Sequence, residues 1–439
     1  MKTKLILILA IGLLSHFGFV QDFDRTKLDD FFDALETNNR FMGSVAVSKE
    51  GEIIYTRTIG FSDIENNVKA NENTKYRIAS ITKTFTAVLV FKAVEKGKLS
   101  IDQTIDKYFP DIKNAEKITI GHLLAHRSGI PNYTLDAEKK SKKEIIDILS
   151  RYDSDFEPDS RAVYGSSNYV LLAYILEEIF NRSYPDLLSE HITKPIGLEN
   201  TYLGCKINTK NNESNSYRFE GDWKLEAEMD MTVAYGSAGI VSTSHDMVKF
   251  SDALFGGELI KHEHLEQMKT IRDNFGMGLW PMPFQEKTGY GHGGRIDGFI
   301  CGFRNYADGN VTIAITSNGF NINIVDVPNA LLSAVYNEPY DIPVFKTYEV
   351  TSEDLDKYLG VYSSPDFPIK VTITKDDCTL MAQGAGPSAF PLEATEKHQF
   401  NSFPRGLVLL FNPLENTMIL KLRGSILQQR GEEYTLNKE

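Results

Sequence analysis

Apolar and polar positions first follow the spacing of strands and then that of helices. The segment GSVAVSKEGEIIYTRTIGFSD holds two β-rich runs on either side of a Lys-Glu-Gly turn at 49–51, which predicts a hairpin. A short helix is expected before it, at about 26–37. A longer helix is expected after it, from about 76, and Gly97 is a suitable C-terminal stop.

Between about 100 and 230 the pattern is mainly helical, with loops between the apolar runs. A further helix is expected at 244–255 and a last one near 325–336. Between these two helices, β-rich runs return at 290–319, where Asp308-Gly309 marks a hairpin turn. The order of strands, helices, strands and helix predicts an α/β sheet domain that carries a helical insertion.

The pattern changes after the segment 337–355, which is expected to be a boundary. Beyond it, short β-rich runs are separated by turn signals every eight to twelve residues. This spacing predicts a small all-β module, a barrel or a sandwich, at 350–435. The module shows no evident catalytic cluster. The predicted fold class is therefore α+β, with a sheet domain and an all-helical domain at 21–340 followed by the β module.

The N-terminus carries Lys2 and Lys4 ahead of an apolar run at 5–14. This arrangement predicts a secretory signal peptide at 1–20. The run is ten residues long, whereas a membrane-spanning helix needs about 20. We therefore expect an exported protein, periplasmic or extracellular, with no membrane span in the mature chain.

Composition narrows the classes of partner and cofactor. The 439 residues carry a net charge of −13, which argues against nucleic-acid binding. The chain has three cysteines, Cys205, Cys301 and Cys378, so at most one disulfide can form, and the sequence does not select the pair. All three are interpreted as structural residues. The oligomeric state stays open.

Two histidine patterns are compatible with metal binding but lack further ligands. His122 and His126 stand four residues apart, with no third ligand evident. Structural and catalytic zinc sites need at least three protein ligands. The segment 262–264, His-Glu-His, is expected to be an exposed helix start. The sequence therefore predicts no metal and no cofactor.

Ser80 and Lys83 are the first candidates for chemistry. Residues three apart on a helix lie on one face. A buried lysine loses its charge readily and can then accept the proton of a serine hydroxyl. The alternative is a serine that caps the helix beside a solvated lysine, and the pair alone does not exclude it.

Four segments in order give the pair its context: YRIASITKTFTA, ITIGHLLAHRSGIP, VYGSSNYVLLAYILEEI and YGHGGRIDGF. Together they resemble the serine β-lactamase and penicillin-binding-protein-like superfamily, in its class C-like branch, over roughly 25–335. The resemblance implies an active site between an antiparallel sheet domain and a helical domain. It also implies a small-molecule or peptide substrate. The C-terminal module resembles the lipocalin-like modules appended to such hydrolases.

The resemblance assigns roles to single residues. Ser80 becomes the acylated nucleophile, and Lys83 and Tyr164 share its proton. This role requires a Tyr164 pKa lowered by the lysine charge. The family pattern Tyr-x-Asn is not kept, because Ser166 stands in place of the asparagine. Asn168 is expected to face its own helix instead.

The family has a third motif after the serine and tyrosine motifs. This chain offers two candidates for it, Lys287-Thr288-Gly289 and His292-Gly293-Gly294. They lie five residues apart and cannot occupy the same place on one strand. The family pattern favours His292, with Gly293 and Gly294 admitting the substrate to the strand. The N–H groups of Arg295 and Ser80 are expected to form an oxyanion hole. The Arg295 side chain either binds a substrate carboxylate or is turned away by strand alternation.

Two classes of function follow. The first is an exported serine hydrolase acting through a Ser80 acyl-enzyme on amides or esters, as a D-Ala-D-Ala carboxypeptidase, a D-peptidase, an esterase or a weak β-lactamase. The second is a catalytically weak, penicillin-recognising binding or sensor protein. The loss of the motif asparagine at Ser166 keeps the second class open.

Overall fold

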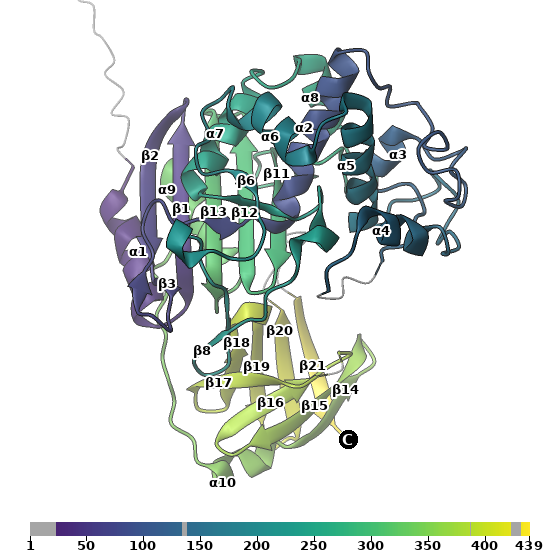
Figure 1. The fold of residues 1–439 in the computed structure, drawn as a ribbon. Helices are drawn as coiled ribbons and strands as arrows, with labels where there is room; N and C mark the ends of the chain where they lie inside the picture. The colour runs from purple at the N-terminus through teal and green to yellow at the C-terminus, as the bar shows by residue number, and fades with distance from the viewer. Residues whose placement is uncertain (1–22, 134–137, 387, 423–431) are drawn as a thin grey trace, which may run out of the picture.

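The computed structural model describes residues 23–133, 138–386, 388–422 and 432–439 (Figure 1). The predicted signal peptide at 1–20 lies outside these residues. Among the helices that are described, none is both long and apolar enough to cross a bilayer.

A central sheet organises the first three quarters of the chain. Its main path runs β10-β11-β12-β13-β1-β2, with β7 and β8 attached at the side, as far as the described residues show. The predicted hairpin is confirmed as β1 (Phe41–Lys49) and β2 (Glu52–Ile59). The turn between them takes left-handed conformations at Glu50 and Gly51, with φ of 55° and 82°.

The later strands of the sheet also form where expected. They are β11 (Gly289–Ile296), β12 (Phe299–Tyr306) and β13 (Val311–Phe320), all antiparallel, and β13 pairs with β1. At the end of the sheet, β10 (Trp280–Pro281) pairs with only two residues of β11, Tyr290 and Gly291. In the described part of the chain, β11 therefore has an unpaired edge from His292 onwards.

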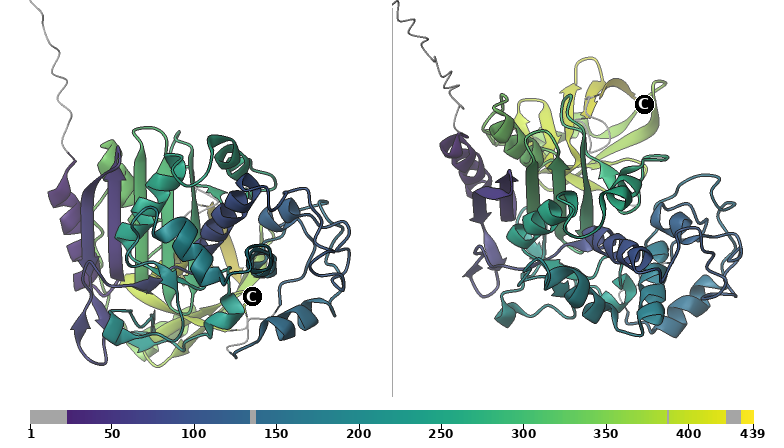
Figure 2. Two further views of the ribbon diagram at one scale, coloured as in Figure 1. Left: turned by 45° about the horizontal axis from the view of Figure 1, so that its top comes forward. Right: turned by 90° about the horizontal axis from the view of Figure 1, so that it is seen from above.

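The two faces of the sheet are covered by different helices (Figures 1 and 2). On one face α1 (Arg25–Thr37) and α9 (Asp326–Tyr336) bury apolar side chains against Ile313 and Ile315. On the other face α7 (Ser244–Phe255) places Phe250 in a stack with Phe85, 3.7 Å between ring centroids. Strand alternation produces this division, because successive side chains of β13 point to opposite faces.

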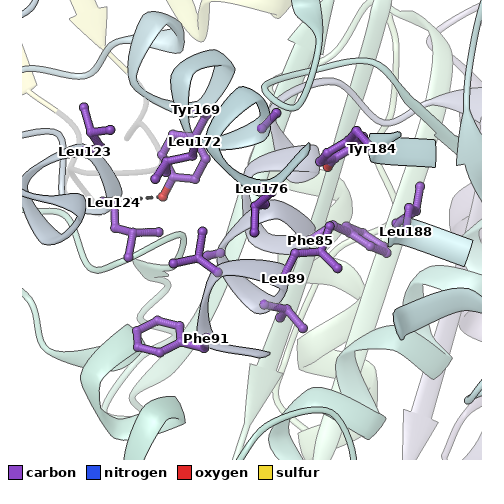
Figure 3. Packing of buried hydrophobic residues seen from close by; sticks show 14 of the residues in the cluster. Phe85, Leu89, Phe91, Leu123, Leu124, Tyr169, Leu172, Leu176, Tyr184 and Leu188 are labelled. Carbon is purple, nitrogen blue, oxygen red and sulfur yellow. Dashed lines mark hydrogen bonds between the residues drawn. The ribbon is translucent and has the colours of Figure 1, made fainter. Parts of the chain in front are cut away.

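The helical region packs on that second face as one apolar cluster (Figure 3). Its centre is α2 (Thr82–Glu95) against α5 (Ser166–Phe180), both of which bury nearly every side chain along their length. Tyr169 is held among them by a hydrogen bond from its hydroxyl to the Leu124 carbonyl, 2.7 Å. The other helices are α3 (Ile120–Leu124), α4 (Lys142–Leu149), α6 (Tyr184–Leu188) and α8 (His262–Lys269).

Several short strands were not expected from the sequence. They are β3 (Phe61–Asp63), β4 (Val68–Lys69), β5 (Tyr76–Arg77), β6 (Tyr202–Leu203), β7 (Tyr217–Phe219), β8 (Trp223–Leu225) and β9 (Ile240–Ser242). Strand β9 pairs with both β5 and β6. Runs of two or three residues carry too little periodicity to be recognised before the fold brings their partners together.

The C-terminal module is a closed barrel, which decides between the two predicted architectures. A short helix, α10 (Ser352–Leu355), precedes it. Its strands are β14 (Gly360–Ser364), β15 (Phe367–Asp376), β16 (Thr379–Gln383), β17 (Phe390–Glu396), β18 (Gln399–Ser402), β19 (Leu407–Asn412), β20 (Thr417–Leu422) and β21 (Glu432–Lys438). The barrel has an apolar core of its own.

Arg40 joins the barrel to the sheet domain. Its guanidinium donates two hydrogen bonds to the Glu393 carboxylate, at 2.7 and 2.6 Å. The same group lies over the rings of Phe345 and Phe403, about 4.5 and 4.3 Å from their centroids. The guanidinium of this buried residue thus contacts the linker and the barrel together.

All three cysteines lie in the described residues and all are free. The disulfide that the sequence allowed is therefore not formed. Cys301 is buried on β12, and burial raises the pKa of its thiol to about 12. Cys205 and Cys378 are exposed.

Candidate active site

Ser80 lies in a 3-10 helix, Ala79–Ile81, and the α-helix begins only at Thr82. The prediction that Ser80 opens the α-helix is therefore wrong by one short turn. Ala79 takes a left-handed φ of 50°, a conformation that costs a residue with a Cβ atom about 1–2 kcal/mol. Such strain persists where neighbouring structure fixes the backbone, and it is common at functional sites.

Gly294 on β11 shows what fixes that turn. A Cβ atom at this position would lie 2.4 Å from the Ile78 oxygen and 2.9 Å from the Ser80 nitrogen. The strand therefore packs backbone to backbone against the turn that carries Ser80. A side chain here would push Ser80 away from the strand, so glycine is required by close approach.

Lys83 follows Ser80 by one turn and is completely buried. Its Nζ lies 3.1 Å from Ser80 Oγ, 3.3 Å from Ser166 Oγ and 3.0 Å from the Ser237 carbonyl oxygen. Burial lowers the pKa of Lys83 to about 7. At neutral pH a large fraction of this amine is uncharged, with a lone pair within reach of the serine proton.

Tyr164 comes from the loop before α5, and its hydroxyl is buried. Among the described residues the hydroxyl has no hydrogen-bond partner, although Lys83 Nζ lies 4.8 Å from the ring centroid. The expected lowering of the Tyr164 pKa is wrong. Burial raises this pKa, and the neighbouring Ser80 side chain offsets only part of the rise. Tyr164 is therefore a protonated phenol at neutral pH and a hydrogen-bond donor.

Ser166 occupies the place of the missing asparagine and contacts Lys83 with its hydroxyl. Its backbone N–H donates to Asn132 Oδ1 at 2.8 Å, so a side chain from a distant loop caps the first turn of α5. Asn168 does not replace the motif asparagine. Its Oδ1 accepts from Ser128 Oγ at 2.6 Å, and its Nδ2 donates back to the Gly165 carbonyl at 3.3 Å.

The two candidates for the third motif are clearly separated. Lys287 lies in the loop before β11, outside the cavity that contains Ser80, and forms an ion pair with Asp308. His292 is fully buried on β11 and lines that cavity. Its imidazole packs against Trp280, 4.3 Å between ring centroids.

The cavity has a volume of about 330 Å³ and extends from Ser80 and β11 to side chains of β12, β13 and α9. It brings together most of the predicted residues, with Lys83 reaching Ser80 from behind. Its walls include Ser80, Tyr164, His292, Gly293, Gly294, Arg295 and Trp280. A Cβ atom at Gly293 would meet only the Cys301 oxygen, at 3.9 Å, so the strand surface is open there.

Arg295 lies three residues after His292 on the same strand. Strand alternation therefore places its side chain on the face opposite to His292 and Gly294. The side chain is exposed, lines the rim of the cavity and makes no ion pair with a described residue. Its backbone N–H stays on the strand that faces Ser80.

Three neighbours of the site were not recognised from the sequence as part of it: His126, Ser237 and Trp280. The His126 ring packs 4.5 Å from that of Tyr164, and its Nδ1 accepts from the Gly165 N–H at 3.2 Å. His126 belongs to the HLLAHRSG segment, but its spacing from His122 indicated only metal binding. Ser237 contributes through its carbonyl and Trp280 through its ring, for which the sequence carried no signal.

The two histidines of that segment point to different partners. His122 Nδ1 accepts from the Thr119 N–H at 3.2 Å and completes a capping box on its own helix, whereas His126 faces Tyr164. The described residues contain no group of three or more His, Cys, Asp or Glu side chains that could hold a metal. At 262–264, His262 does begin α8, but His264 packs on Phe91 rather than facing solvent.

The chain is similar to known proteins over most of its length. The family model described as Beta-lactamase matches residues 28–335. The chain is 26% identical over 415 residues to penicillin-binding protein 4* of Bacillus subtilis, covering 86% of this chain and 91% of that protein. It is 24% identical over 325 residues to the teichoic acid D-alanine hydrolase of Staphylococcus aureus, covering 72% and 79%.

A solved structure shares the fold over nearly the whole chain. The octameric penicillin-binding protein homologue from Pyrococcus abyssi matches with a TM-score of 0.65 at 22% identity, covering 94% of this chain and 99% of that chain. This likeness concerns the fold. With the family match over most of the sheet and helical regions, the chain belongs to the Beta-lactamase family and is a serine hydrolase.

Proposed function

We propose that Ser80 is the nucleophile and that Lys83 is its general base. One observation supports this assignment most strongly: Lys83 Nζ is buried, and it lies 3.1 Å from Ser80 Oγ. The Ser80 oxygen attacks the carbonyl carbon of the substrate while its proton passes to neutral Lys83. Collapse of the tetrahedral adduct breaks the bond to the leaving group and leaves an acyl-serine.

Tyr164 acts as a donor in this scheme. Because burial raises the pKa of its phenol, it is suited to hydrogen-bond a developing negative charge or to pass a proton to the leaving group. The proton taken by Lys83 is delivered to the leaving group on this side of the cavity. Water then attacks the acyl-serine and gives one proton to Lys83, which returns it to Ser80 Oγ as the ester bond breaks and the acid product leaves.

The N–H groups of Ser80 and Arg295 are proposed as the oxyanion hole. Ser80 lies in the first turn of a helix, where backbone N–H groups lack intrahelical acceptors. The close approach at Gly294 brings β11 beside this turn. Two donors from rigid elements would stabilise the tetrahedral oxyanion without reorganisation.

The proposed substrates are amides and esters, among them derivatives of D-amino acids. The names of two relatives, a penicillin-binding protein and a teichoic acid D-alanine hydrolase, support this class. It includes D-Ala-D-Ala carboxypeptidase and other D-peptidase activity, ester hydrolysis and weak β-lactam hydrolysis. Contact between Ser166 and Lys83 favours turnover over a penicillin sensor, because the lysine keeps a hydroxyl partner where the asparagine is missing.

We further propose that the protein is exported, on the basis of the sequence at 1–20. The mature hydrolase would then act in the periplasm or outside the cell. Expression in a bacterial host, followed by N-terminal sequencing of the exported protein, tests this part. A chain that keeps Met1 and stays inside the cell would contradict it.

Covalent labelling tests the catalytic assignment. The protein is treated with a fluorescent penicillin or a fluorophosphonate, digested and examined by mass spectrometry. We expect the adduct on Ser80, and turnover in a panel of D-Ala-D-Ala peptides, cephalosporins and short-chain nitrophenyl esters. An adduct on another serine, or acylation with no turnover in any of these substrates, would contradict the proposal.

A further inference from the structure

The two nitrogens of the His292 imidazole have different surroundings. Nδ1 lies 2.5 Å from the backbone oxygen of Gly293. Nε2 is buried and has no hydrogen-bond partner among the described residues. The ring lines the cavity that contains Ser80, between Trp280 and Tyr164.

The contact to Gly293 determines which nitrogen holds the proton. A carbonyl oxygen can only accept, so Nδ1 must carry the hydrogen. In a neutral imidazole Nε2 then carries a lone pair. His292 therefore holds a buried acceptor at Nε2, in a ring that lines the cavity.

Protonation does not convert this acceptor into a donor at physiological pH. Burial is the main cause that lowers the pKa of His292, and the charge of Lys83 adds to it, so that the pKa falls to about 3. A lysine at this position would be a cation with three donors. The third motif of this chain has the opposite hydrogen-bonding character to a Lys-Thr-Gly motif.

Tyr164 supplies a complementary group in the same cavity. Its hydroxyl is a buried donor beside the Ser80 side chain and forms no other hydrogen bond with a described residue, and its ring centroid lies 6.4 Å from that of His292. A carboxamide could satisfy both, with an N–H for His292 Nε2 and a carbonyl oxygen for Tyr164. A carboxylate offers acceptors only and would set a lone pair against Nε2.

We propose that His292 selects substrates with an amide N–H beside β11 and rejects those with a free carboxylate there. This inference rests on the proposed function and narrows it. The leaving group is an amine that carries a carboxamide or continues as a peptide, and the enzyme acts as an amidase or an endopeptidase on D-residues. Carboxypeptidase action on a terminal D-residue is disfavoured.

A matched substrate pair tests the selection. N-acetyl-D-Ala-D-Ala-NH2 and N-acetyl-D-Ala-D-Ala differ only in the carboxamide or carboxylate of the leaving group. We expect kcat/KM of the wild-type enzyme to favour the amide by about 10- to 100-fold, the range that an unpaired buried polar group produces. His292→Lys should reverse the preference, and His292→Gln, which offers both a donor and an acceptor, should largely remove it.

A reference substrate distinguishes failure of the proposed function from failure of the selection by His292. p-Nitrophenyl acetate carries neither group and reports whether each variant still forms an acyl-enzyme. If no substrate acylates Ser80, the proposed function fails. If Ser80 is acylated and the wild-type enzyme uses the acid as well as or better than the amide, only the selection by His292 is overturned.

The tautomer can be measured without any variant enzyme being active. Long-range proton–nitrogen correlation spectra distinguish the Nδ1–H from the Nε2–H imidazole, and comparison with His292→Gln assigns the signal among the nine histidines. We expect the Nδ1–H form from pH 6 to 8. An Nε2–H or doubly protonated ring in this range would overturn the inference, even if His292→Lys did not fold.

Discussion

The barrel and the region around Ser80 are both buried interiors, but they are filled in opposite ways. The barrel core is made of apolar side chains, with Tyr358 packed 5.0 Å from Phe400 and 4.9 Å from Phe411. The Tyr358 hydroxyl pairs with His398 Nδ1 at 2.7 Å. The buried polar side chains of the described barrel residues are Thr395, Asn401 and Ser402. None of them is charged, although Asn401 Oδ1 has no hydrogen-bond partner among the described residues.

The region around Ser80 buries groups that stability alone would exclude. Lys83 is an amine without an acidic partner among the described residues, and Tyr164 and His292 each leave a buried polar atom unpaired. Buried unpaired groups each cost about 1–3 kcal/mol. The comparison teaches that the barrel stabilises its own fold, whereas the catalytic region gives up stability to hold reactive groups ready.

A buried arginine, Arg77, supports the region around Ser80 through an ion pair and hydrogen bonds. Arg77, three residues before Ser80, is buried and donates to Asp297 at 3.0 Å and to the Cys205 and Met229 carbonyls at 2.7 and 3.1 Å. Asp297 lies in the turn between β11 and β12. Arg77 therefore links the segment before Ser80 to the end of β11, the strand that carries His292 and Arg295.

The largest expected effect is the loss of acylation in Ser80→Ala. The variant should lose activity by about 10⁴- to 10⁶-fold, because Ser80 is the group that we propose forms the covalent intermediate. Its melting temperature should change little, since Ser80 is only half-buried. Penicillin labelling and steady-state turnover check this. Labelling that survives in the variant would move the nucleophile elsewhere.

Lys83→Met should lose activity by about 10³-fold or more and yet gain stability. The pKa of Lys83 is about 7 in the folded protein against an ordinary value of 10.5. Between these values the unfolded chain binds more protons, so the stability of the wild-type protein rises as pH increases from 7 to 10.5. Methionine removes this penalty, by about 1–4 kcal/mol at pH 6.5.

Urea unfolding at pH 6.5 and pH 10 measures this effect. The gain from Lys83→Met should be larger at pH 6.5 than at pH 10. A lysine replacement in the barrel, Lys370→Met, is the control, because Lys370 is exposed and forms a surface ion pair with Glu439; it should change stability little at either pH. A loss of stability in Lys83→Met at both pH values would contradict the burial argument.

The next effect separates the two candidates for the third motif. His292→Ala should lower kcat/KM by about 10- to 100-fold, because it removes a buried polar contact to the substrate. Lys287→Ala should stay within about threefold, because an exposed ion pair such as that with Asp308 contributes about 0–1 kcal/mol. Equal damage from both variants would show that the third motif was assigned wrongly.

A smaller effect is expected at the junction of the two regions. Glu393→Gln keeps the shape of the side chain but removes the charge that faces Arg40, which should cost about 1 kcal/mol because Glu393 is partly exposed. Turnover should stay within about twofold, since we propose no acid, base or nucleophile in the barrel. A large loss of turnover in a folded variant would show that docking of the barrel completes the site.

The sequence predicted the elements well wherever the signal was local. The hairpin at 49–51 needed only turn residues, and the helix before Gly97 and the strands at 290–319 needed only apolar spacing and a stop. The order of the four motifs was enough to predict that Ser80, Tyr164 and His292 line one cavity.

The remainder depended on tertiary contact. The left-handed Ala79 follows from the approach of β11, which no local pattern encodes. The direction of the Tyr164 pKa depends on how deeply the hydroxyl is buried. Likewise, the acceptor character of His292 follows from a single backbone oxygen, that of Gly293.

The smallest expected effect concerns Arg295, which lies where the two regions meet. Its charge lowers the pKa of Arg405 in the barrel, in addition to the larger effect of burial on that residue. Since strand alternation turns the Arg295 side chain away from the face of His292, Arg295→Ala should alter kcat/KM for a peptide acid and for a nitrophenyl ester alike, within about threefold. Relief of the like-charge contact should add a few tenths of a kcal/mol to stability, about the size of an exposed ion-pair effect. A rise in KM confined to peptides with a free D-residue would instead show that the guanidinium reaches round the strand to a substrate carboxylate, and the rim of the cavity would then belong to the catalytic region rather than to the junction with the barrel.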